Sequence, residues 1–327
     1  MAHQDLSWRT VVQRRRYSDG LDAVEERLST VAGTYAEPLG SAARSLLGAG
    51  GKRVRPLLTL LCASRRAPLA AAVVHAATAA ELLHMATLVH DDVLDRAELR
   101  RGRATVAHEY GVETAVSTGN FLLARAFAEL ALTGDGAAVA LLSKTAVGLS
   151  EGEVLQRQEA YDVTLGVDAY RRRCERKTAD LFAAAARLGA LLSGIGERQQ
   201  LALGEYGRLL GLAFQVFDDI LDLDGDEDLT GKRLGADIRD GTVTLPLIYA
   251  LETRPDLGPR LRDGGRLDEA GVAALIAEVR ATGAIARARG TATGFIERAQ
   301  RLLSACSDDV ERDLLGEVAR SVVDRYA

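Results

Sequence analysis

The chain is poor in cysteine, proline and tryptophan, and these shortages narrow the possible classes of protein. Its 327 residues include three cysteines, six prolines and one tryptophan. Because Cys62, Cys174 and Cys306 stand far apart and form no CxxC pair, a disulfide scaffold is a poor interpretation and a reducing compartment is favoured. The arginine run near the start is not followed by an apolar stretch, so no secretory or export signal is predicted. We therefore predict a cytoplasmic location.

The sequence also lacks an excess of positive charge and a nucleotide-binding loop. It contains 41 Lys and Arg against 46 Asp and Glu, a net charge of -5. Binding to a phosphate backbone requires the opposite balance, so nucleic acid is not an expected partner. No GxxxxGK[ST] run occurs, which disfavours nucleotide hydrolysis. The longest apolar run, residues 69–89, contains His75, Glu81 and His84 and predicts a buried helix instead of a transmembrane segment.

Helical periodicity dominates what is present. Apolar residues return every three or four positions in segments rich in Ala, Leu, Glu and Arg, and few strands are expected. No linker or composition shift divides the chain, so we predict one all-α domain over residues 19–327, a many-helix bundle, preceded by a polar arm over residues 1–18. The segments with the clearest repeat are Leu21–Leu47, Ala70–Leu94, Thr114–Leu132, Ala137–Tyr161, Ala169–Leu192, Gln199–Leu223 and Val243–Glu252.

Two acidic clusters share one spacing. Asp91, Asp92 and Asp95 close the first apolar helix, and Asp218, Asp219 and Asp222 repeat the pattern Asp-Asp-x-x-Asp at the end of a later one. On a helix, residues i and i+4 lie on one face, so each cluster brings carboxylates together. Faces made only of carboxylates suit a hard cation such as Mg²⁺, which binds through one or two carboxylates, waters and substrate phosphates. The run from Asp222 to Arg233 departs from a calcium loop, since it lacks glycine at its sixth position and glutamate at its twelfth.

Basic residues accompany both clusters. The run Gly50-Gly51-Lys52-Arg53-Val54-Arg55-Pro56 precedes the first cluster and Arg100-Arg101 follow it, while Lys177 and Lys232 flank the second. Arginine supplies a planar fork for phosphate oxygens and lysine a mobile charge. Together with the carboxylates, these cations predict a site for a diphosphate.

At this point the sequence resembles the trans-prenyl diphosphate synthases. The runs GGKRVRP, ELLHMATLVHDDVLDRAELRRG, GEVLQ, KTADLF, FQVFDDILD, GKRLGAD and TLPLI occur in the order of that family. The resemblance implies a single all-α domain with a central cavity, a homodimer, and Mg²⁺-dependent condensation of an allylic diphosphate with isopentenyl diphosphate. It also implies that both aspartate motifs hold the allylic diphosphate through Mg²⁺.

The resemblance further implies a role for each matching residue. Asp91, Asp95 and Asp218 are the implied main metal ligands, with Asp92, Asp219 and Asp222 supporting them. Arg100, Lys177 and Lys232 are implied to bind the allylic diphosphate, and Lys52, Arg55, His84 and Arg101 the diphosphate of isopentenyl diphosphate. Thr178 and Gln215 are implied to face the developing cation, which gives Lys177, Thr178 and Gln215 as the catalytic set.

The chain departs from the family pattern at two places, and other functions stay open. Asn120 stands where Asp is usual, and Thr242 replaces a usual lysine, which weakens the expected diphosphate site. A cyclase of the same fold would discard the isopentenyl site, and a silent partner subunit would have lost aspartates. A synthase of geranylgeranyl or farnesyl diphosphate, and a prenyltransferase acting on another acceptor, are further alternatives.

The residues before the first motif predict a medium- or long-chain product. On a helix, Thr87 lies one turn before Asp91, Leu83 about two turns and Ala80 about three. A turn rises roughly 5.4 Å, comparable to one isoprene unit. In the family that the sequence resembles, a bulky aromatic residue just before the motif stops the growing chain, so the small Ala86 and Thr87 imply room for a product of about thirty carbons or more. Leu83, or Phe121 or Phe127 of a facing helix, is expected to form a lower floor.

Overall fold

The computed structural model describes residues 15–33, 37–48, 50–66, 68–100, 102–225 and 234–324. The chain divides into two compact units. Unit 1 comprises residues 1–147, 181–207 and 302–318, and unit 2 comprises residues 148–180, 208–301 and 319–327. The prediction of one domain from residue 19 stays a prediction. Helix α2 begins at Arg15 and buries Tyr17, and residues 1–14 of the predicted arm lie outside the described residues.

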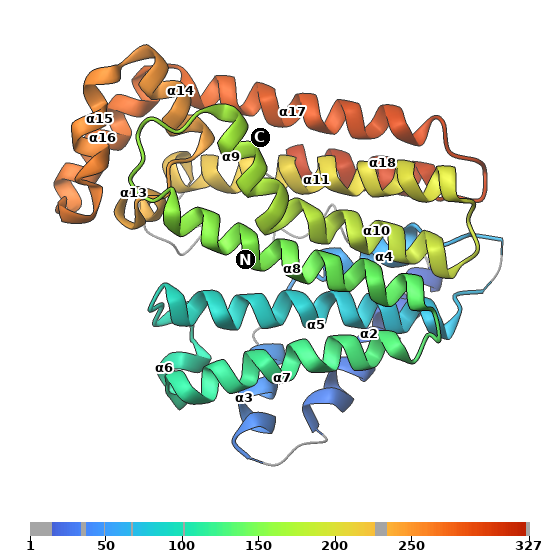
Figure 1. The fold of residues 1–327 in the computed structure, drawn as a ribbon. Coiled ribbons are helices and arrows are strands. Elements are labelled where there is room, and N and C mark those ends of the chain that lie inside the picture. The colour runs from blue at the N-terminus through green and yellow to red at the C-terminus, as the bar shows by residue number, and fades with distance from the viewer. Residues whose placement is uncertain are drawn as a thin grey trace. The chain divides into compact units, whose positions relative to one another are not determined.

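The described residues form helices and one short hairpin (Figure 1). The helices up to the middle of the chain are α2 (Arg15–Gly33), α3 (Leu39–Gly48), α4 (Val54–Leu61), α5 (Ala71–Leu94), α6 (Val106–Tyr110), α7 (Val112–Ala131), α8 (Gly136–Gln158), α9 (Val167–Cys174), the π-helix η1 (Glu175–Ala179) and α10 (Asp180–Leu192). After these come α11 (Glu197–Asp224), α13 (Ala236–Asp240), α14 (Leu245–Thr253), η2 (Pro255–Leu257), α15 (Gly258–Arg262), η3 (Gly264–Arg266), α16 (Glu269–Ala281), α17 (Ala284–Leu303) and α18 (Arg312–Asp324). The strands β1 (Leu99–Arg100) and β2 (Arg103–Ala104) pair antiparallel, with Leu99 opposite Ala104. The all-α prediction is confirmed.

In unit 1, α5 and α7 lie side by side along most of their length (Figure 1). Ala77, Ala80 and Leu83 of α5 and Leu122 and Ala126 of α7 are among the buried residues. Small residues let the helices approach closely. A side chain at Gly119 of α7 would collide with the imidazole of His90, and one at Gly189 of α10 with the carbonyl of Thr59 in α4. Gly119 therefore sets the packing beside the first aspartate motif, and Gly189 sets the packing of α10 on α4.

In unit 2, the end of α11 carries the second motif, and α9 and η1 pack near it. Phe217 and Ile220 of α11 are buried. A Cβ atom at Gly152 of α8 would lie 2.6 Å from the backbone nitrogen of Lys177, so glycine lets α8 meet the π-helix backbone to backbone. Gly152 is the first residue of the motif GEVLQ, and the close packing of α8 on η1 requires glycine there.

The prediction of a continuous helix over Leu21–Leu47 was wrong. The segment Leu21–Leu47 forms two helices, because α2 ends at Gly33 and α3 begins at Leu39, directly after Pro38. Proline lacks the amide hydrogen of a helix interior and disfavours helical backbone in the residue before it, which explains the break.

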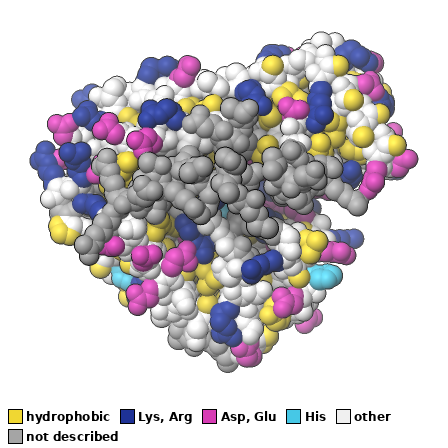
Figure 2. Space-filling view, turned by 180° about the vertical axis from the view of Figure 1, so that it is seen from behind, with side chains coloured by type: hydrophobic (Ala, Val, Ile, Leu, Met, Phe, Trp, Pro, Cys, Tyr) yellow, Lys and Arg dark blue, Asp and Glu magenta, His cyan; other side chains and the backbone are white. Residues whose placement is uncertain are grey.

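Helix α5 is, within the described ranges, the one helix with the length and composition of a membrane span. Of its apolar window, 67% is buried inside the protein, as in the core helix of a globular fold. On the described residues of the face in Figure 2, basic and acidic side chains are interspersed, in keeping with the nearly balanced composition.

Candidate active site

The first aspartate motif occupies the C-terminal end of α5 in unit 1. Asp91 is half-buried and Asp95, which caps the helix, is exposed, while Asp92 between them is only 2% exposed. The amide of Asp95 donates to the carbonyl of Asp91 at 2.8 Å, so both residues keep the helical i, i+4 relation. The outer two carboxylates are therefore accessible and the middle one is not.

A hairpin returns a basic residue to the buried aspartate. The backbone turns after α5 at Arg96, the β1–β2 hairpin follows, and Arg100 donates from Nε to Oδ1 of Asp92 at 2.7 Å. Burial raises the pKa of Asp92 although Arg100 opposes this shift. Arg100 thus lies beside the motif and is bound to Asp92, and its binding of the allylic diphosphate stays a prediction. Arg101 lies outside the described residues.

The other basic pair of unit 1 lies at the start of α4, with Lys52 in the loop before the helix. Lys52 is exposed, and Arg55, in the first turn of α4, places its guanidinium 4.7 Å from the ring centre of Phe182. His84 is half-buried on α5, two turns before Asp91. Unit 1 therefore holds Lys52, Arg55 and His84, the described residues assigned to the second diphosphate.

The second aspartate motif repeats the same division of exposure in unit 2. Asp218 is exposed, Asp219 is 4% exposed, and Asp222 is half-buried. Asp219 accepts from Tyr170 Oη at 2.6 Å and from Gln215 Nε2 at 2.9 Å, and burial raises its pKa to about 6. Asp222 accepts the backbone amides of Ala236 at 2.9 Å and Asp237 at 3.0 Å. It therefore caps α13, a structural task that the metal assignment did not include.

The π-helix η1 presents Lys177 and Thr178. Lys177 Nζ donates to Glu153 Oε2 of α8 at 2.6 Å, and Thr178 Oγ1 donates to Gln215 Oε1 at 2.7 Å. A continuous set of bonds thus runs from Thr178 through Gln215 to Asp219. π-helical turns inside α-helices are frequent at functional sites. Lys232 lies outside the described residues.

Sequence reasoning missed several residues that hold these groups in place. Glu153 pairs with Lys177, and Tyr170 binds Asp219. Arg173, only 3% exposed, bonds Glu159 at 2.8 Å and the carbonyl of Val243 at 2.6 Å. The motif GEVLQ contains Glu153 and was a usable signal, whereas nothing in the sequence pairs Tyr170 with Asp219.

The donors fit a hard divalent cation. The accessible carboxylates of Asp91 and Asp95 in unit 1, and separately that of Asp218 in unit 2, supply only oxygen, which Mg²⁺ prefers. Within the described ranges, no three His, Cys, Asp or Glu side chains form a ready-made metal site. Mg²⁺ commonly keeps waters and takes further ligands from substrate phosphates.

The predicted chain-length residues lie along the buried part of α5. Ala80, Leu83 and Ala86 are buried and Thr87 is half-buried, with its hydroxyl donating to the carbonyl of His84 at 2.7 Å. On α7, Phe121 and Phe127 are half-buried.

The two residues at which the sequence departs from the family pattern lie as follows. Asn120 is exposed, and the amide of Thr242 donates to the carbonyl of Asp237 at 2.8 Å.

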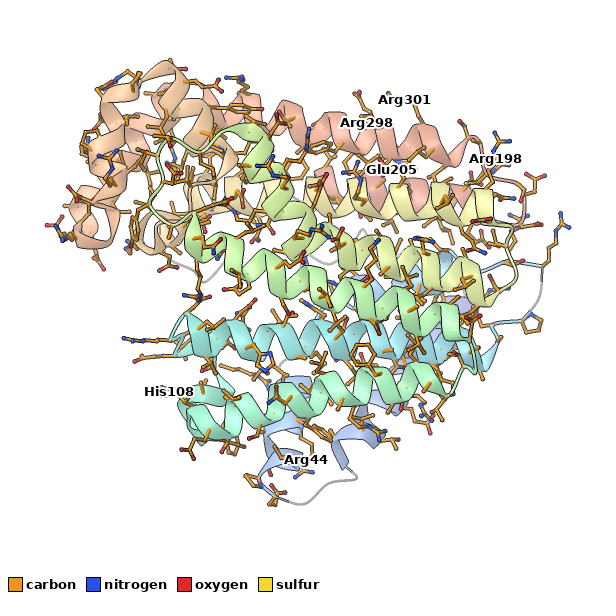
Figure 3. The ribbon with its side chains drawn as sticks, in the orientation of Figure 1. Arg44, His108, Arg198, Glu205, Arg298 and Arg301 are labelled. Atoms are coloured by element: carbon orange, nitrogen blue, oxygen red, sulfur yellow. The ribbon has the colours of Figure 1, made fainter. Side chains whose placement is uncertain are left out.

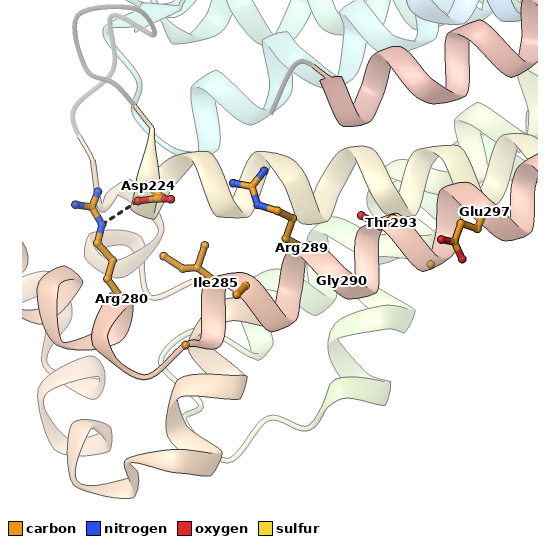
Figure 4. Close-up of a pocket in the computed structure, with 10 residues that line it drawn as sticks. Asp224, Arg280, Ile285, Arg289, Gly290, Thr293 and Glu297 are labelled. Atoms are coloured by element: carbon orange, nitrogen blue, oxygen red, sulfur yellow. Dashed lines mark ion pairs between the residues drawn. The ribbon is translucent and has the colours of Figure 1, made fainter. Parts of the chain in front are cut away.

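Two pockets in unit 2 contain none of the predicted site residues. The larger has a volume of about 660 Å³ along α17, where Asp224 pairs with Arg280 at 3.3 Å (Figure 4). The smaller, about 380 Å³, includes Arg208 and Arg298, and Arg298 lies on the same helix as Arg301 (Figure 3). Neither pocket is the predicted site.

Comparison with known proteins decides the family. The family model for polyprenyl synthetase matches residues 36–274. The chain belongs to the polyprenyl synthetase family. It is 40% identical to heptaprenyl diphosphate synthase component 2 of Geobacillus stearothermophilus, over 92% of this chain and 94% of that protein. It is 35% identical to nonaprenyl diphosphate synthase of Mycobacterium tuberculosis, over 94% and 92%.

A solved relative shows the same fold. The polyprenyl synthase of Caulobacter crescentus, complexed with calcium and isoprenyl diphosphate, superposes with a TM-score of 0.89 at 33% identity and covers 98% of each chain. The predicted family and fold are confirmed, and this polyprenyl synthetase is a prenyltransferase of the polyprenyl diphosphate synthase class.

Proposed function

We propose that this polyprenyl synthetase condenses an allylic diphosphate with isopentenyl diphosphate in trans, 1'-4 fashion, to make a medium- or long-chain polyprenyl diphosphate. The observation that carries the proposal is the repeated motif, in which the first aspartate is accessible and the second is buried and hydrogen-bonded. The division matches the assignment of Asp91, Asp95 and Asp218 as main ligands of Mg²⁺. Asp92 and Asp219 then support them from buried positions, and the half-buried Asp222 supports them while it caps α13.

The first chemical requirement is charge neutralisation on the leaving diphosphate. Bound Mg²⁺ supplies that neutralisation, because a metal ion stabilises developing charge on phosphoryl oxygens. Both aspartate motifs serve the allylic diphosphate in this proposal, with Arg100, Lys177 and Lys232 as its cationic ligands. Arg100 and Lys177 are already oriented by Asp92 and Glu153, so little reorganisation is needed when the diphosphate binds.

The second chemical requirement is that the acceptor, isopentenyl diphosphate, is bound in a fixed position. Lys52, Arg55, His84 and Arg101 bind the diphosphate of isopentenyl diphosphate and keep its double bond within reach of the allylic cation. The Thr178 hydroxyl donates its proton to Gln215, so the lone pairs of its oxygen remain to interact with other groups. Such lone pairs suit the proposed role of Thr178 in facing the allylic cation. Proton loss completes the step, and the released diphosphate is the proposed base.

Incubation of the purified chain with isopentenyl diphosphate and each allylic diphosphate, followed by sizing of the products, tests the proposal. We expect Mg²⁺-dependent elongation. Cyclic hydrocarbon from an allylic diphosphate alone would favour a cyclase, and a prenylated product only with another acceptor would favour a different prenyltransferase. Turnover only after addition of a second, different subunit would favour a partner role.

Aromatic substitution at Ala86 or Thr87 is expected to shorten the product by several isoprene units. Each turn of α5 rises about 5.4 Å, so a phenyl group one turn before Asp91 closes the path above the floor expected at Leu83, which lies two turns before Asp91. Thin-layer or mass-spectrometric sizing of the wild type, Ala86→Phe and Thr87→Phe products measures this. The conservative Thr87→Ser variant should keep the wild-type length. A wild-type enzyme that stops at geranylgeranyl diphosphate would contradict the long-chain proposal.

Removing one basic side chain should raise KM for one of the two substrates and not for the other. Lys52→Ala is expected to raise KM for isopentenyl diphosphate about 10- to 100-fold, since one charged contact contributes about 1.5 to 3 kcal/mol. Lys177→Ala should instead act on KM for the allylic diphosphate. Steady-state kinetics with each substrate varied in turn measures both. Equal effects on the two KM values would reject the division into two diphosphate sites.

We also propose a cytoplasmic homodimer. Val112 and Val116 of α7 are 57% and 39% exposed, and with Leu123 they fall on one helical face. Val116→Asp is expected to shift the dimer toward monomer in analytical ultracentrifugation, whereas Leu201→Asp, at another exposed apolar residue of unit 1, should not. A monomeric wild type would contradict the proposal.

A further inference from the structure

Arg53 lies between the two basic residues assigned to isopentenyl diphosphate and has an unusual backbone conformation. It precedes α4 with φ 46° and ψ 38°, in the left-handed region that residues other than glycine seldom occupy. Its carbonyl accepts the amide of Leu57 at 2.9 Å and so starts the helix. A strained conformation at such a place persists only where surrounding contacts fix it.

The guanidinium of Arg53 provides those contacts. Its Nε and Nη2 donate to the two carboxylate oxygens of Glu25 in α2, at 2.5 and 3.2 Å, and its Nη1 donates to Glu81 of α5 at 2.9 Å. The Arg53 side chain is 11% exposed and that of Glu81 only 4%. The planar fork of arginine can serve both carboxylates at once, which a lysine ammonium cannot do in the same geometry.

These bonds fix the loop against the helix that carries other site residues. Lys52 directly precedes Arg53, and Arg55 follows it within the first turn of α4. Glu81 lies one turn before His84 on α5, whose C-terminal end holds the first aspartate motif. All these residues belong to unit 1.

We propose that Arg53 is a positioning residue that, through its bonds to Glu25 and Glu81, holds Lys52 and Arg55 in the orientation that binds the diphosphate of isopentenyl diphosphate. Arg53 itself need not touch the substrate. The inference rests on the proposed function, because it takes Lys52 and Arg55 as the ligands of that diphosphate.

Arg53→Asn tests the proposal, because asparagine tolerates left-handed backbone better than other residues with side chains and so removes the guanidinium selectively. We expect KM for isopentenyl diphosphate to rise about tenfold, the factor that corresponds to one lost charged contact. KM for the allylic diphosphate and kcat should stay within about twofold. Arg53→Lys, which keeps the charge but not the fork, should recover only part of the loss.

A double variant shows whether Arg53 acts through its neighbour. If it orients Lys52, the effect of Arg53→Asn should shrink once Lys52 is alanine, so the double variant should raise KM by less than the product of the two single effects. A residue with a merely structural role would lower the midpoint of thermal unfolding without this coupling. Arg27→Asn is the matched control, since Arg27, on α2, likewise pairs with a buried glutamate, Glu129. It should lower thermal stability and leave KM unchanged.

The outcomes separate this inference from the proposed function. If Lys52→Ala raises KM for isopentenyl diphosphate and Arg53→Asn does not, the positioning role is wrong and the site assignment stands. If Lys52→Ala itself has no effect, the site assignment fails first. Should Arg53→Asn fail to fold, Glu25→Gln removes charge from its more exposed partner, 49% exposed, and the same selective rise in KM is required of it.

Discussion

Replacing Asp91 or Asp218 with alanine is expected to lower kcat at least about a thousandfold while leaving the helices intact. Each carboxylate is accessible at the end of a helix, so little packing is lost. Losing charge stabilisation of several kcal/mol corresponds to this factor, because each 1.4 kcal/mol or so is tenfold in rate. Steady-state assays with saturating Mg²⁺ and both substrates measure kcat, and circular dichroism checks the fold. Excess chelator should stop the wild-type reaction as well.

The matched control is another aspartate at the C-terminal end of α11, the helix that carries Asp218. Asp224 closes α11 two residues after Asp222, but it pairs with Arg280, and both side chains are 42% exposed. Asp224→Ala should keep near-normal turnover. Near-normal turnover of Asp91→Ala or Asp218→Ala with Mg²⁺, or wild-type activity in excess chelator, would show that the metal assignment is wrong.

The parts of the site that follow from local sequence were predictable. Apolar periodicity predicted the helix over residues 70–94, and α5 spans Ala71–Leu94. Because a helix fixes the relation of residues i and i+4, the pairing of Asp91 with Asp95 followed without knowledge of the fold. The close approach of His90 to Gly119, in contrast, involves two separate helices and did not follow from local sequence.

The parts that depend on distant contacts were not predictable. The middle aspartates Asp92 and Asp219 look identical in sequence, yet one is bound by Arg100 from a hairpin and the other by Tyr170 and Gln215. The periodicity of residues 169–192 predicted one helix, but the chain forms π-helical turns at Glu175–Ala179. Side-chain pairing across elements, and not local propensity, decides how each middle aspartate is bound.

A buried charge cluster in unit 1 illustrates the same limit and has a large expected effect on stability. Glu129 of α7 has a fully buried side chain and accepts from Arg27 Nη2 at 2.8 Å and from His75 Nδ1 at 2.9 Å. Arg125 lies 3.4 Å from the same carboxylate. The carboxylate thereby joins α2, α5 and α7, while the sequence shows only one more glutamate in a helical segment.

Glu129→Ala is expected to lower the free energy of unfolding by about 3 kcal/mol, the lower end of the range for removing one partner of a buried ion pair, because Arg27 is 35% exposed and regains water. Denaturant titration measures the loss, with the exposed Glu113→Ala on the same helix as a control expected to change stability by less than about 0.5 kcal/mol.

Burial alone would raise the pKa of Glu129, but the bonds from Arg27 and His75 outweigh it and the pKa lies below its ordinary 4.5. A lowered carboxyl pKa contributes stability that is present above the ordinary pKa and is lost as pH falls through the lowered one. Wild type should therefore lose stability below pH 4.5 more steeply than Glu129→Ala, and parallel pH profiles would contradict a charged Glu129 at the centre of the cluster.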